Sequence, residues 1–230
     1  MAQYDQIAKP YDELMGDTGD IPHTFLINPL MSSSLPKEKD LTVLDLGCGN
    51  GYWTKLLAKK YKKVVGIDNS QNLIKIAKNK RQLSNIEYKL VEIETDFPFA
   101  NDSFDLIFSN MVIHYIKNLI KLTEELYRII KPNGLIIFSF AHPIFESTKN
   151  QSLKSTKTRT PYKTSTLGGS AELTLQYEPL DLIIKKFLNS GFKLVQQKDA
   201  IIPADLAKKY PRYQDYIGLP RAAILIFKKN

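Results

Sequence analysis

From position 41 onward, the chain alternates short apolar runs with longer stretches in which apolar residues recur at helical spacing. Runs of the first kind predict strands, and amphipathic stretches with a period near 3.6 residues predict helices. The predicted strands cover residues 42–46, 63–68, 86–91, 104–109, 134–140, 192–197 and 223–228. The predicted helices cover residues 52–60, 71–82, 116–130 and 179–190. Because strands and helices alternate, we expect βαβ units and an α/β, doubly wound fold around a largely parallel sheet.

Two turn signals support these boundaries. Residues 131–134 read Lys-Pro-Asn-Gly and predict a helix stop and a turn directly before the fifth strand. Ser190 and Gly191 predict the same arrangement before the sixth strand.

Three segments lie outside the alternation, at residues 1–40, 147–175 and 198–220. The second is rich in Ser, Thr, Lys and Gly and predicts a mobile insertion after the fifth strand. The third separates two strands that a short hairpin usually joins, and it contains Tyr210, Tyr213 and Tyr216. All three are candidates for a lid, because connections at the carboxyl ends of parallel strands surround the ligand crevice. A structural cap or a disordered connector is the alternative for each.

Composition bounds the class of protein. The 230 residues suffice for one domain with added segments, and 43% hydrophobic and 24% charged residues are ordinary globular usage. No apolar run approaches the roughly 18 residues of a membrane span. The N-terminus is polar and acidic where a secretion signal needs an apolar stretch, and the single cysteine, Cys48, cannot form an internal disulfide. We therefore expect a cytoplasmic protein without a membrane partner.

The net charge of +8 makes a nucleic acid or another acidic partner worth considering. The basic residues are 27 lysines and only five arginines, whereas bidentate recognition of phosphates and guanines depends on arginine. The lysines also fall singly or in pairs over predicted helix faces. A solvated lysine-rich surface is therefore favoured over a nucleic-acid-binding face.

The strongest local motif is VLDLGCGNGYW at residues 43–53. An apolar strand leads into Asp45, and Gly47, Gly49 and Gly51 alternate before a helix begins. Glycines permit positive φ and let a ligand approach the backbone, and the helix N-terminus presents free N–H groups. Asp68 ends the next strand, 23 positions after Asp45, where an acid can accept hydrogen bonds from ribose hydroxyls.

The motif departs from two other nucleotide-binding patterns. The dinucleotide fingerprint G-x-G-x-x-G fails in both registers, because Tyr52 or Thr54 stands where the third glycine is required. A phosphate-binding loop with G-K-S or G-K-T is absent as well. The pattern therefore favours a ligand without a pyrophosphate, and a purely structural glycine turn is the alternative.

VLDLGCGNGYW resembles the first motif of the class I S-adenosylmethionine-dependent methyltransferases, and GIDNS resembles their second. VEIETDFPFANDSFDLIFSNMVIHYI is similar to the acidic loop and fourth strand of the family, and LYRIIKPNGLIIFSF to its fifth-strand segment. The resemblance spans about residues 4–140. FSFAHPIF is similar to bacterial small-molecule-type members with His-Pro after strand five. The resemblance implies a seven-stranded, mostly parallel, Rossmann-like sheet whose last strand is antiparallel.

The domain organisation that follows is one methyltransferase domain over residues 1–230. Residues 1–40 form an N-terminal cap, 41–146 the cofactor-binding core and 147–175 the insertion. Residues 176–230 supply the C-terminal helix and strands, with a substrate-side insertion.

The resemblance also implies the residues that hold S-adenosyl-L-methionine and its product S-adenosyl-L-homocysteine. Gly47, Cys48 and Gly49 line the methionine and ribose portions, and Asp45 orients the loop and reaches the methionine ammonium. The other implied contacts are Asp68 on the ribose diol, Asn69 and Leu73 beside adenine, Ile93 through its backbone and Glu94 through its side chain facing adenine, Asn110 toward the methionine end, and Tyr4 and Tyr11 closing over the cofactor. Glu92 replaces Glu94 if the register is shifted.

The cofactor dictates the kind of chemistry. A sulfonium methyl group is already activated, so the protein excludes water and aligns a nucleophile, with no metal or covalent enzyme intermediate required. A general base helps only where the acceptor loses a proton. His142, at the carboxyl edge after strand five, is the candidate catalytic base, and the alternative is that Pro143 makes this segment a fixed turn in which His142 is structural. We expect a surface or cap role for His23 and a packing or orienting role for His114.

The function that this reading favours is methyl transfer to O or N of a small-molecule acceptor. Two alternatives stay open: an RNA or protein methyltransferase that uses the lysine-rich residues 149–163 as an electrostatic arm, and a non-catalytic S-adenosylmethionine-binding module. The sequence contains no N/D-P-P-Y motif, no Pro-Cys nucleophile pair and no appended RNA-binding module.

Overall fold

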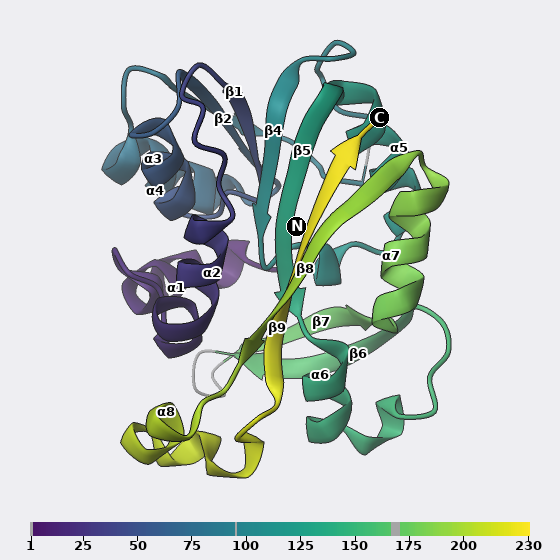
Figure 1. Cartoon of the computed structure of the whole chain (residues 1–230). Helices are drawn as coiled ribbons and strands as arrows, with labels where there is room; N and C mark the ends of the chain where they lie inside the picture. Colours follow the sequence, from purple (N-terminus) through teal and green to yellow (C-terminus); the bar gives the residue numbers. More distant parts are fainter. Residues whose placement is uncertain (1, 95, 167–170) are drawn as a thin grey trace.

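A seven-stranded sheet forms the centre of the molecule in the computed structural model, which describes residues 2–94, 96–166 and 171–230 (Figure 1). The strand order is β3-β2-β1-β4-β5-β9-β8, and β9 runs antiparallel to both of its neighbours. The strands are β1 (Thr42–Leu46), β2 (Lys63–Asp68), β3 (Ile86–Leu90), β4 (Phe104–Asn110), β5 (Ile130–Ala141), β8 (Phe192–Ile201) and β9 (Pro220–Lys229). The predicted seven-stranded α/β sheet with an antiparallel last strand is confirmed.

Helices cover both faces of the sheet, because each central strand is apolar on both sides. In β1, Val43 packs into the core on the face of α3 and α4, while Leu44 packs into the opposite core beneath α5 and α7. The α-helices are α1 (Ala8–Met15), α2 (Asn28–Ser33), α3 (Tyr52–Ala58), α4 (Gln71–Arg81), α5 (Leu119–Ile129), α6 (Pro143–Lys149), α7 (Leu180–Asn189) and α8 (Ala204–Lys209). No helix among the described residues has the length and apolarity needed to cross a bilayer.

The turn predicted at residues 131–134 is wrong, because these residues lie inside β5. Helix α5 ends at Ile129, and the strand begins at the next residue. The pairing of β5 with β4 shifts register between Ile130 and Leu135, and Asn133 takes a positive φ of 65°. The Pro-Asn-Gly sequence therefore produces an irregularity within a strand instead of a turn before it.

The segment 147–175 contains regular structure. It includes the end of α6, a 3-10 turn (Gln151–Leu153) and most of a two-stranded antiparallel sheet made of β6 (Thr160–Thr166) and β7 (Ala171–Tyr177). Residues 167–170 lie outside the described part of the chain. The predicted mobility of this segment stays a prediction.

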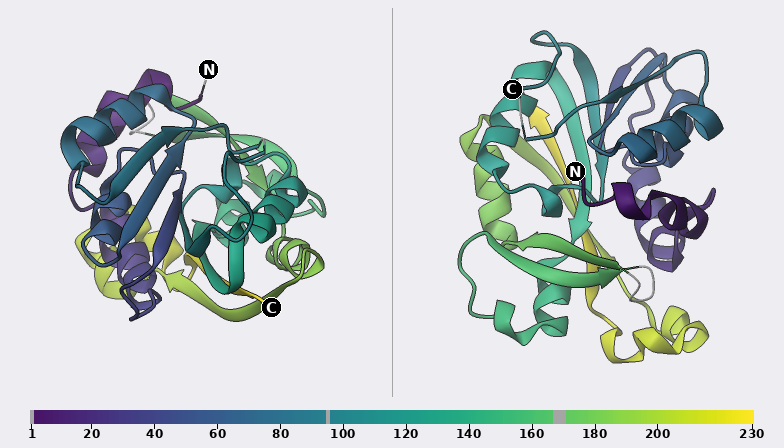
Figure 2. Two further views of the ribbon diagram at one scale, coloured as in Figure 1. Left: turned by 90° about the horizontal axis from the view of Figure 1, so that it is seen from above. Right: turned by 180° about the vertical axis from the view of Figure 1, so that it is seen from behind.

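The added segments gather at the carboxyl ends of the parallel strands. In Figure 1, α1, α6, α8 and the β6–β7 pair all lie at the lower end of the sheet. Figure 2 shows the N-terminal segment beside the β6–β7 pair when the molecule is seen from behind. The Gln3 side-chain amide joins them, because its Nε2 donates to the Thr174 carbonyl at 3.1 Å and its Oε1 accepts from the Thr174 N–H at 2.7 Å. These segments therefore enclose the end of the sheet where ligands bind in such folds.

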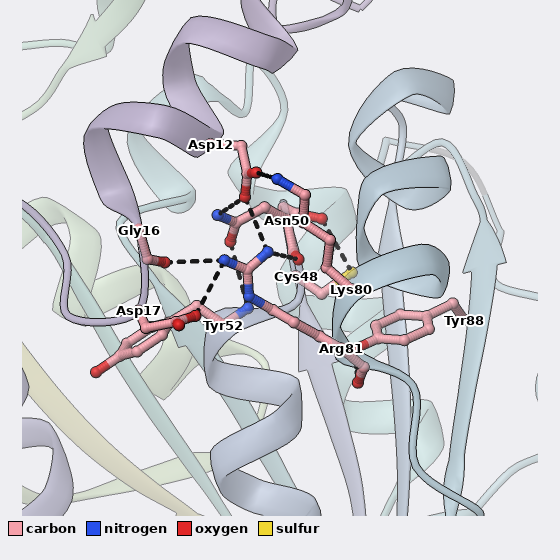
Figure 3. Close-up of polar contacts among 10 residues, drawn as sticks. Asp12, Gly16, Asp17, Cys48, Asn50, Tyr52, Lys80, Arg81 and Tyr88 are labelled. Carbon is pink, nitrogen blue, oxygen red and sulfur yellow. Dashed lines mark hydrogen bonds and ion pairs between the residues drawn. The ribbon is translucent and has the colours of Figure 1, made fainter.

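A buried ionic network fixes helix α1 to helix α4 and to the glycine loop (Figure 3). Asp12 of α1 accepts hydrogen bonds from Arg81 Nη1 at 2.8 Å, from Lys80 Nζ at 2.5 Å and from Asn50 Nδ2 at 2.8 Å. Arg81 also donates to the Gly16 carbonyl at 2.9 Å, at the end of α1. Asp12 and Arg81 are almost fully buried. The network therefore holds the N-terminal cap in place over the core.

We expect Asp12→Ala to destabilise the chain by about 3–5 kcal/mol, because it leaves the Arg81 guanidinium buried without its carboxylate. Lys80→Ala, which removes a half-exposed partner of the same carboxylate, should cost less than about 1 kcal/mol. Burial acts to raise the pKa of Asp12, but the hydrogen bonds from Lys80 and Arg81 outweigh it and hold the pKa below its usual value. The contribution of Asp12 is therefore complete at neutral pH and is lost as the pH falls through that lowered pKa. Urea unfolding at pH 7 tests this, and equal effects of the two variants would contradict it.

Candidate active site

A cavity of about 570 Å³ opens at the carboxyl ends of the strands. This is the size range of sites for ligands such as cofactors and metabolites. Its lining comes from the glycine loop, from the ends of β2 and β4, from the loop after β3, from the N-terminal cap and from the β6–β7 pair. Of the predicted cofactor-binding residues it includes Tyr4, Tyr11, Gly47, Gly49, Asp68, Asn69, Leu73, Ile93, Glu94 and Asn110.

The glycine loop is held against the end of β2 by backbone hydrogen bonds. The N–H groups of Gly47 and Cys48 both donate to the Ile67 carbonyl, at 2.8 and 2.9 Å. Gly47 has a φ of 72°, and a Cβ added there would lie 2.3 Å from a methyl group of Val112. Position 47 therefore needs glycine for two reasons: its backbone is left-handed, and the loop after β4 approaches it closely through Val112.

Asp68 ties this loop to the start of α4. Its Oδ2 accepts from the Gly49 N–H and its Oδ1 from the Ser70 N–H, each at 2.9 Å. Burial raises the pKa of the Asp68 carboxyl above its usual value, and the backbone hydrogen bonds oppose that effect. Each carboxylate oxygen has two lone pairs, so both can still accept hydrogen bonds from a ligand diol.

The adjacent part of the cavity offers apolar walls with polar groups beside them. Leu73 and Ile93 are buried and line the cavity from α4 and from the loop after β3. Asn69 donates to Glu92 at 3.3 Å. Glu94 Oε1 accepts from the backbone N–H groups of Lys117 and Asn118, at 2.6 and 2.9 Å, so part of this carboxylate serves the loop before α5. Two apolar walls beside a carboxylate at Asp68 fit an adenine ring and its ribose.

At the end of β4, the backbone is held in an unusual conformation. Asn110 Oδ1 accepts from Ser139 Oγ at 2.6 Å, and the next residue, Met111, has a positive φ of 59°. The Met111 N–H donates to the Ser139 carbonyl at 3.0 Å. Such strained non-glycine residues concentrate at functional sites. The predicted role of Asn110 toward the methionine end stays a prediction.

Tyr4, Tyr11 and Tyr115 form a cluster at the cavity, and Tyr11 lies beside Gly49 of the glycine loop. Tyr4 and Tyr115 share a hydrogen bond between their hydroxyls at 2.8 Å, and the Tyr4 ring meets Tyr11 edge to face at 5.0 Å. Burial raises the pKa of all three, and that of Tyr115 reaches about 12. They are therefore neutral hydroxyls that exclude water from this side of the cavity.

Two of the predicted cofactor-binding residues do not line the cavity. The Asp45 carboxylate is buried and accepts from Thr54 Oγ1 at 2.6 Å, so it points into the start of α3. The Cys48 thiol packs in the core on the α3 side, and burial raises its pKa, which keeps it protonated. In β1, Asp45 shares a face with Val43, two residues earlier, and this face packs against α3, so the carboxylate points away from the cavity.

Asp45 gives a pH-dependent prediction. Burial raises its pKa to about 7, the Thr54 hydrogen bond opposes this, and the charge of Asp68 adds to it. Because the folded state holds this proton more tightly than the unfolded state does, the free energy of unfolding falls as the pH rises from about 4, the unfolded pKa, to about 7, the folded pKa. We expect Asp45→Asn to flatten that decline and to raise the stability of the cofactor-free chain at pH 8. Thermal unfolding at pH 5 and pH 8 measures it, and equal slopes for both proteins would contradict it.

The candidate base His142 does not line the cavity. Its ring is buried, and its Nδ1 accepts from the Ile144 N–H at 3.1 Å, so the side chain caps helix α6. The Nε2 atom lies 3.7 Å from Asp199 Oδ1 on the edge strand β8, which pairs with the other side of β9. The structural alternative at His142-Pro143 therefore agrees with its placement, since Pro143 is the first residue of α6 and His142 caps the next N–H, that of Ile144.

The other two histidines do line the cavity. His23 Nδ1 lies 2.6 Å from Asp20 Oδ1. Burial acts to raise the pKa of Asp20, but the hydrogen bonds from His23 outweigh it and hold that pKa below its usual value. His114 is buried, and burial together with the charge of Arg221 lowers its pKa to about 3. His114 is therefore a neutral side chain, and His23 lies in the N-terminal cap, one of the two placements expected for it, with its side chain at the cavity.

Sequence reasoning missed Arg221, Glu146 and Asp20 as lining residues. A signal for Arg221 existed, because the first residues of an antiparallel last strand lie at the carboxyl edge of the parallel ones. Glu146 and Asp20 lie in segments whose structure the sequence pattern left open. Among the described residues, no three His, Cys, Asp or Glu side chains gather in a way that could hold a metal.

Comparisons with known proteins agree with this geometry. Residues 44–138 match a family model described as a methyltransferase domain. A malonyl-[acyl-carrier protein] O-methyltransferase of Coxiella burnetii is 33% identical over 138 residues, which are 59% of this chain and 45% of that relative. The chain thus spans less than half the length of the curated relative it matches.

Solved structures share the fold. A Listeria monocytogenes protein assigned to the S-adenosylmethionine-dependent methyltransferases superposes with a TM-score of 0.74 at 24% identity, covering 88% of this chain and 96% of that one. The [4+2]-cyclase SpnF has a TM-score of 0.71 at 16% identity, covering 98% and 93%. Since a cyclase shares the fold, the fold alone does not set the reaction.

The strand order, the antiparallel β9 and the glycine loop at the carboxyl ends define the class I methyltransferase fold. The match of residues 44–138 to a methyltransferase domain, together with this fold, supports the resemblance to the class I S-adenosylmethionine-dependent methyltransferases and supports S-adenosylmethionine as the cofactor. The family resemblance in the sequence is confirmed, while the likeness of its His-Pro segment to one bacterial subgroup stays a prediction.

Proposed function

We propose that the chain transfers the methyl group of S-adenosylmethionine to an oxygen or nitrogen of a small-molecule acceptor. One observation carries the proposal: a single cavity joins the surroundings of Asp68 to a second, polar region around His23 and Arg221. The first region fits an adenosine, and the second leaves room for an acceptor next to it. The caps that enclose the cavity favour a small acceptor over a macromolecular one.

When bound, S-adenosylmethionine would supply an activated sulfonium methyl group for direct displacement by the acceptor, with sulfur keeping the electron pair. The side chains of this chain orient and shield. Asp68 would fix the ribose, and the tyrosines at positions 4, 11 and 115 would exclude water that competes for the methyl group. Where the acceptor must lose a proton, His23 is placed to accept it in the cavity, with Asp20 holding its ring.

The relatives named malonyl-[acyl-carrier protein] O-methyltransferases suggest a finer acceptor, a carboxyl group joined to a carrier through a thioester. A malonyl thioester therefore belongs in any panel of candidate acceptors. The match covers under half of those relatives, so the choice of acceptor rests on residues of this chain.

The alternative of an electrostatic arm at residues 149–163 is less well supported. Lys163 pairs with Glu172 across the β6–β7 pair at 2.7 Å, so part of its charge is balanced. Lys149 lines the small-molecule cavity. We expect binding to RNA to be weak and not to contribute to methyl transfer.

The experiment is methyl transfer from radiolabelled S-adenosylmethionine into three fractions: small metabolites, total RNA and protein. The proposal predicts label in the metabolite fraction alone. Label chiefly in RNA, or in protein other than an acyl carrier, would favour the electrostatic arm, whereas label on an acyl carrier would support the finer acceptor named above. Binding of S-adenosylhomocysteine without transfer to any fraction would favour the non-catalytic module.

A further inference from the structure

The five arginines of the chain differ in how their guanidinium groups are used. Arg81, Arg128 and Arg159 each donate several hydrogen bonds to backbone carbonyls and carboxylates, and Arg212 donates to the Tyr213 hydroxyl. The side chain of Arg221 donates none to any described residue, and its Nη1 is buried without a hydrogen-bond partner. An arginine held without an acceptor in this way is costly unless a ligand or water supplies one.

Arg221 lies where an acceptor would bind. It is the second residue of β9, and it lines the cavity together with Glu146 and His114. Its side chain keeps 22% of its surface exposed, toward the cavity that it lines. The guanidinium carbon lies 4.8 Å from the centre of the Phe145 ring, so the aromatic face supports the cationic group. The charge is therefore held in place before any ligand arrives.

The carboxylates near Arg221 are already engaged. Glu146 accepts from the Tyr162 hydroxyl at 2.9 Å, and its Oε1 stands 3.7 Å from Arg221 Nη1, beyond hydrogen-bonding distance. Asp20, whose pKa Arg221 also helps to lower, is bonded to His23. These two groups orient and partly balance the cation, and neither accepts a hydrogen bond from it.

We propose that Arg221 binds a carboxylate of the methyl acceptor, so that the acceptors of this chain are organic acids. The inference rests on the proposed function, because it names the acceptor class for the same cavity. A planar fork of N–H donors matches a carboxylate in a bidentate arrangement. The nearby Glu146 and Asp20 repel a second negative charge, which favours a carboxylate over a doubly charged phosphate ester.

This role predicts which kinetic constant changes. A carboxylate that is not the reacting group interacts with Arg221 equally before and during methyl transfer, so its loss raises KM and leaves kcat little changed. If the bound carboxylate is itself methylated, its charge disappears as the ester forms, and the same loss raises KM without lowering kcat. Both cases separate Arg221 from a residue that merely supports the fold.

The test uses the full chain saturated with S-adenosylhomocysteine and follows the side-chain N–H signal of Arg221 by NMR during titration. The probes are two matched pairs, benzoate with benzamide, and malonyl with acetyl N-acetylcysteamine thioester. We expect at least one acid of the two pairs to shift the Arg221 signal and to bind more tightly than its neutral partner. Arg221→Gln should weaken acid binding by roughly ten- to a hundredfold, the range for hydrogen bonds to charged groups.

Two variants serve as controls. Arg221→Lys keeps the charge without the fork and should recover only part of the affinity. Arg212→Gln removes the same charge at a residue that does not line the cavity and should leave acid binding unchanged. Equal binding of acids and neutral partners, or acid binding that survives Arg221→Gln, overturns the inference. In either case, transfer of label from S-adenosylmethionine to metabolites would show that the proposed function still stands.

Discussion

Asp68→Ala is expected to weaken S-adenosylhomocysteine binding at least about a hundredfold. The substitution removes the carboxylate that we propose for the ribose diol, and charge-assisted hydrogen bonds of this kind contribute about 1.5–3 kcal/mol each. It also releases the Gly49 and Ser70 N–H groups, which hold the glycine loop to the start of α4. Both effects act in the same direction on the cofactor site. Isothermal titration calorimetry measures the affinity directly.

Two variants separate the causes. Asp68→Asn keeps one acceptor oxygen and the size of the side chain, so it should retain more of the loop structure while still losing affinity. Asp96→Ala makes the same deletion at an exposed residue and should bind like the parent chain. Affinity of Asp68→Ala within about threefold of the parent would remove Asp68 from the cofactor site.

Gly47→Ala is expected to have a comparably large effect, through sterics instead of charge. The added Cβ would lie 2.3 Å from Val112 Cγ2, and the backbone φ of 72° strains any residue other than glycine. Positive-φ strain costs on the order of 1–3 kcal/mol, and overpacking a further 1–3 kcal/mol. Relief requires the glycine loop and the loop after β4 to separate, which deforms the cofactor end of the cavity. Urea unfolding and S-adenosylhomocysteine affinity should both fall.

The close contact can be tested by its relief. Val112→Ala deletes both methyl groups that the new Cβ would meet, so the double variant should recover a measurable part of the stability that Gly47→Ala loses. Gly218→Ala supplies the control for backbone strain alone, because its φ is 79° and nothing lies within 4 Å of the added Cβ. If Gly218→Ala costs as much as Gly47→Ala, the contact with Val112 carries no weight.

The core of the fold was predictable because its strands are apolar on both faces and its helices have a clear period. All seven strands and four of the helices lie where the pattern places them, within a few residues. The strand conformation of residues 131–134 could not be predicted, because pairing of β5 with β4 overrides the local turn preference of Pro-Asn-Gly. The β6–β7 pair escaped notice because β6 is a Ser-, Thr- and Lys-rich strand with no buried face.

The candidate site, like the fold, could be predicted only in part. Residues fixed by the motif and by strand ends, such as Gly49, Asp68 and Asn110, lie together in the cavity as their sequence positions imply. Tyr4 and Tyr11 of the N-terminal cap also line the cavity, as the family resemblance implies, whereas side chains of the added segments outside the motifs, such as Asp20 and Glu146, could not be located. His142, the candidate base, does not reach the cavity, because its side chain caps helix α6. His23 does line the cavity, because the N-terminal segment that carries it folds over the opening.

A crystal structure of the full chain with bound S-adenosylhomocysteine tests the central claim most directly. We expect the ribose hydroxyls of this ligand to bind Asp68, its adenine to lie between Leu73 and Ile93, and its sulfur atom to face the region of His23 and Arg221. A ligand seated elsewhere, or one whose sulfur faces away from that region, would contradict the assignment of the two ends of the cavity.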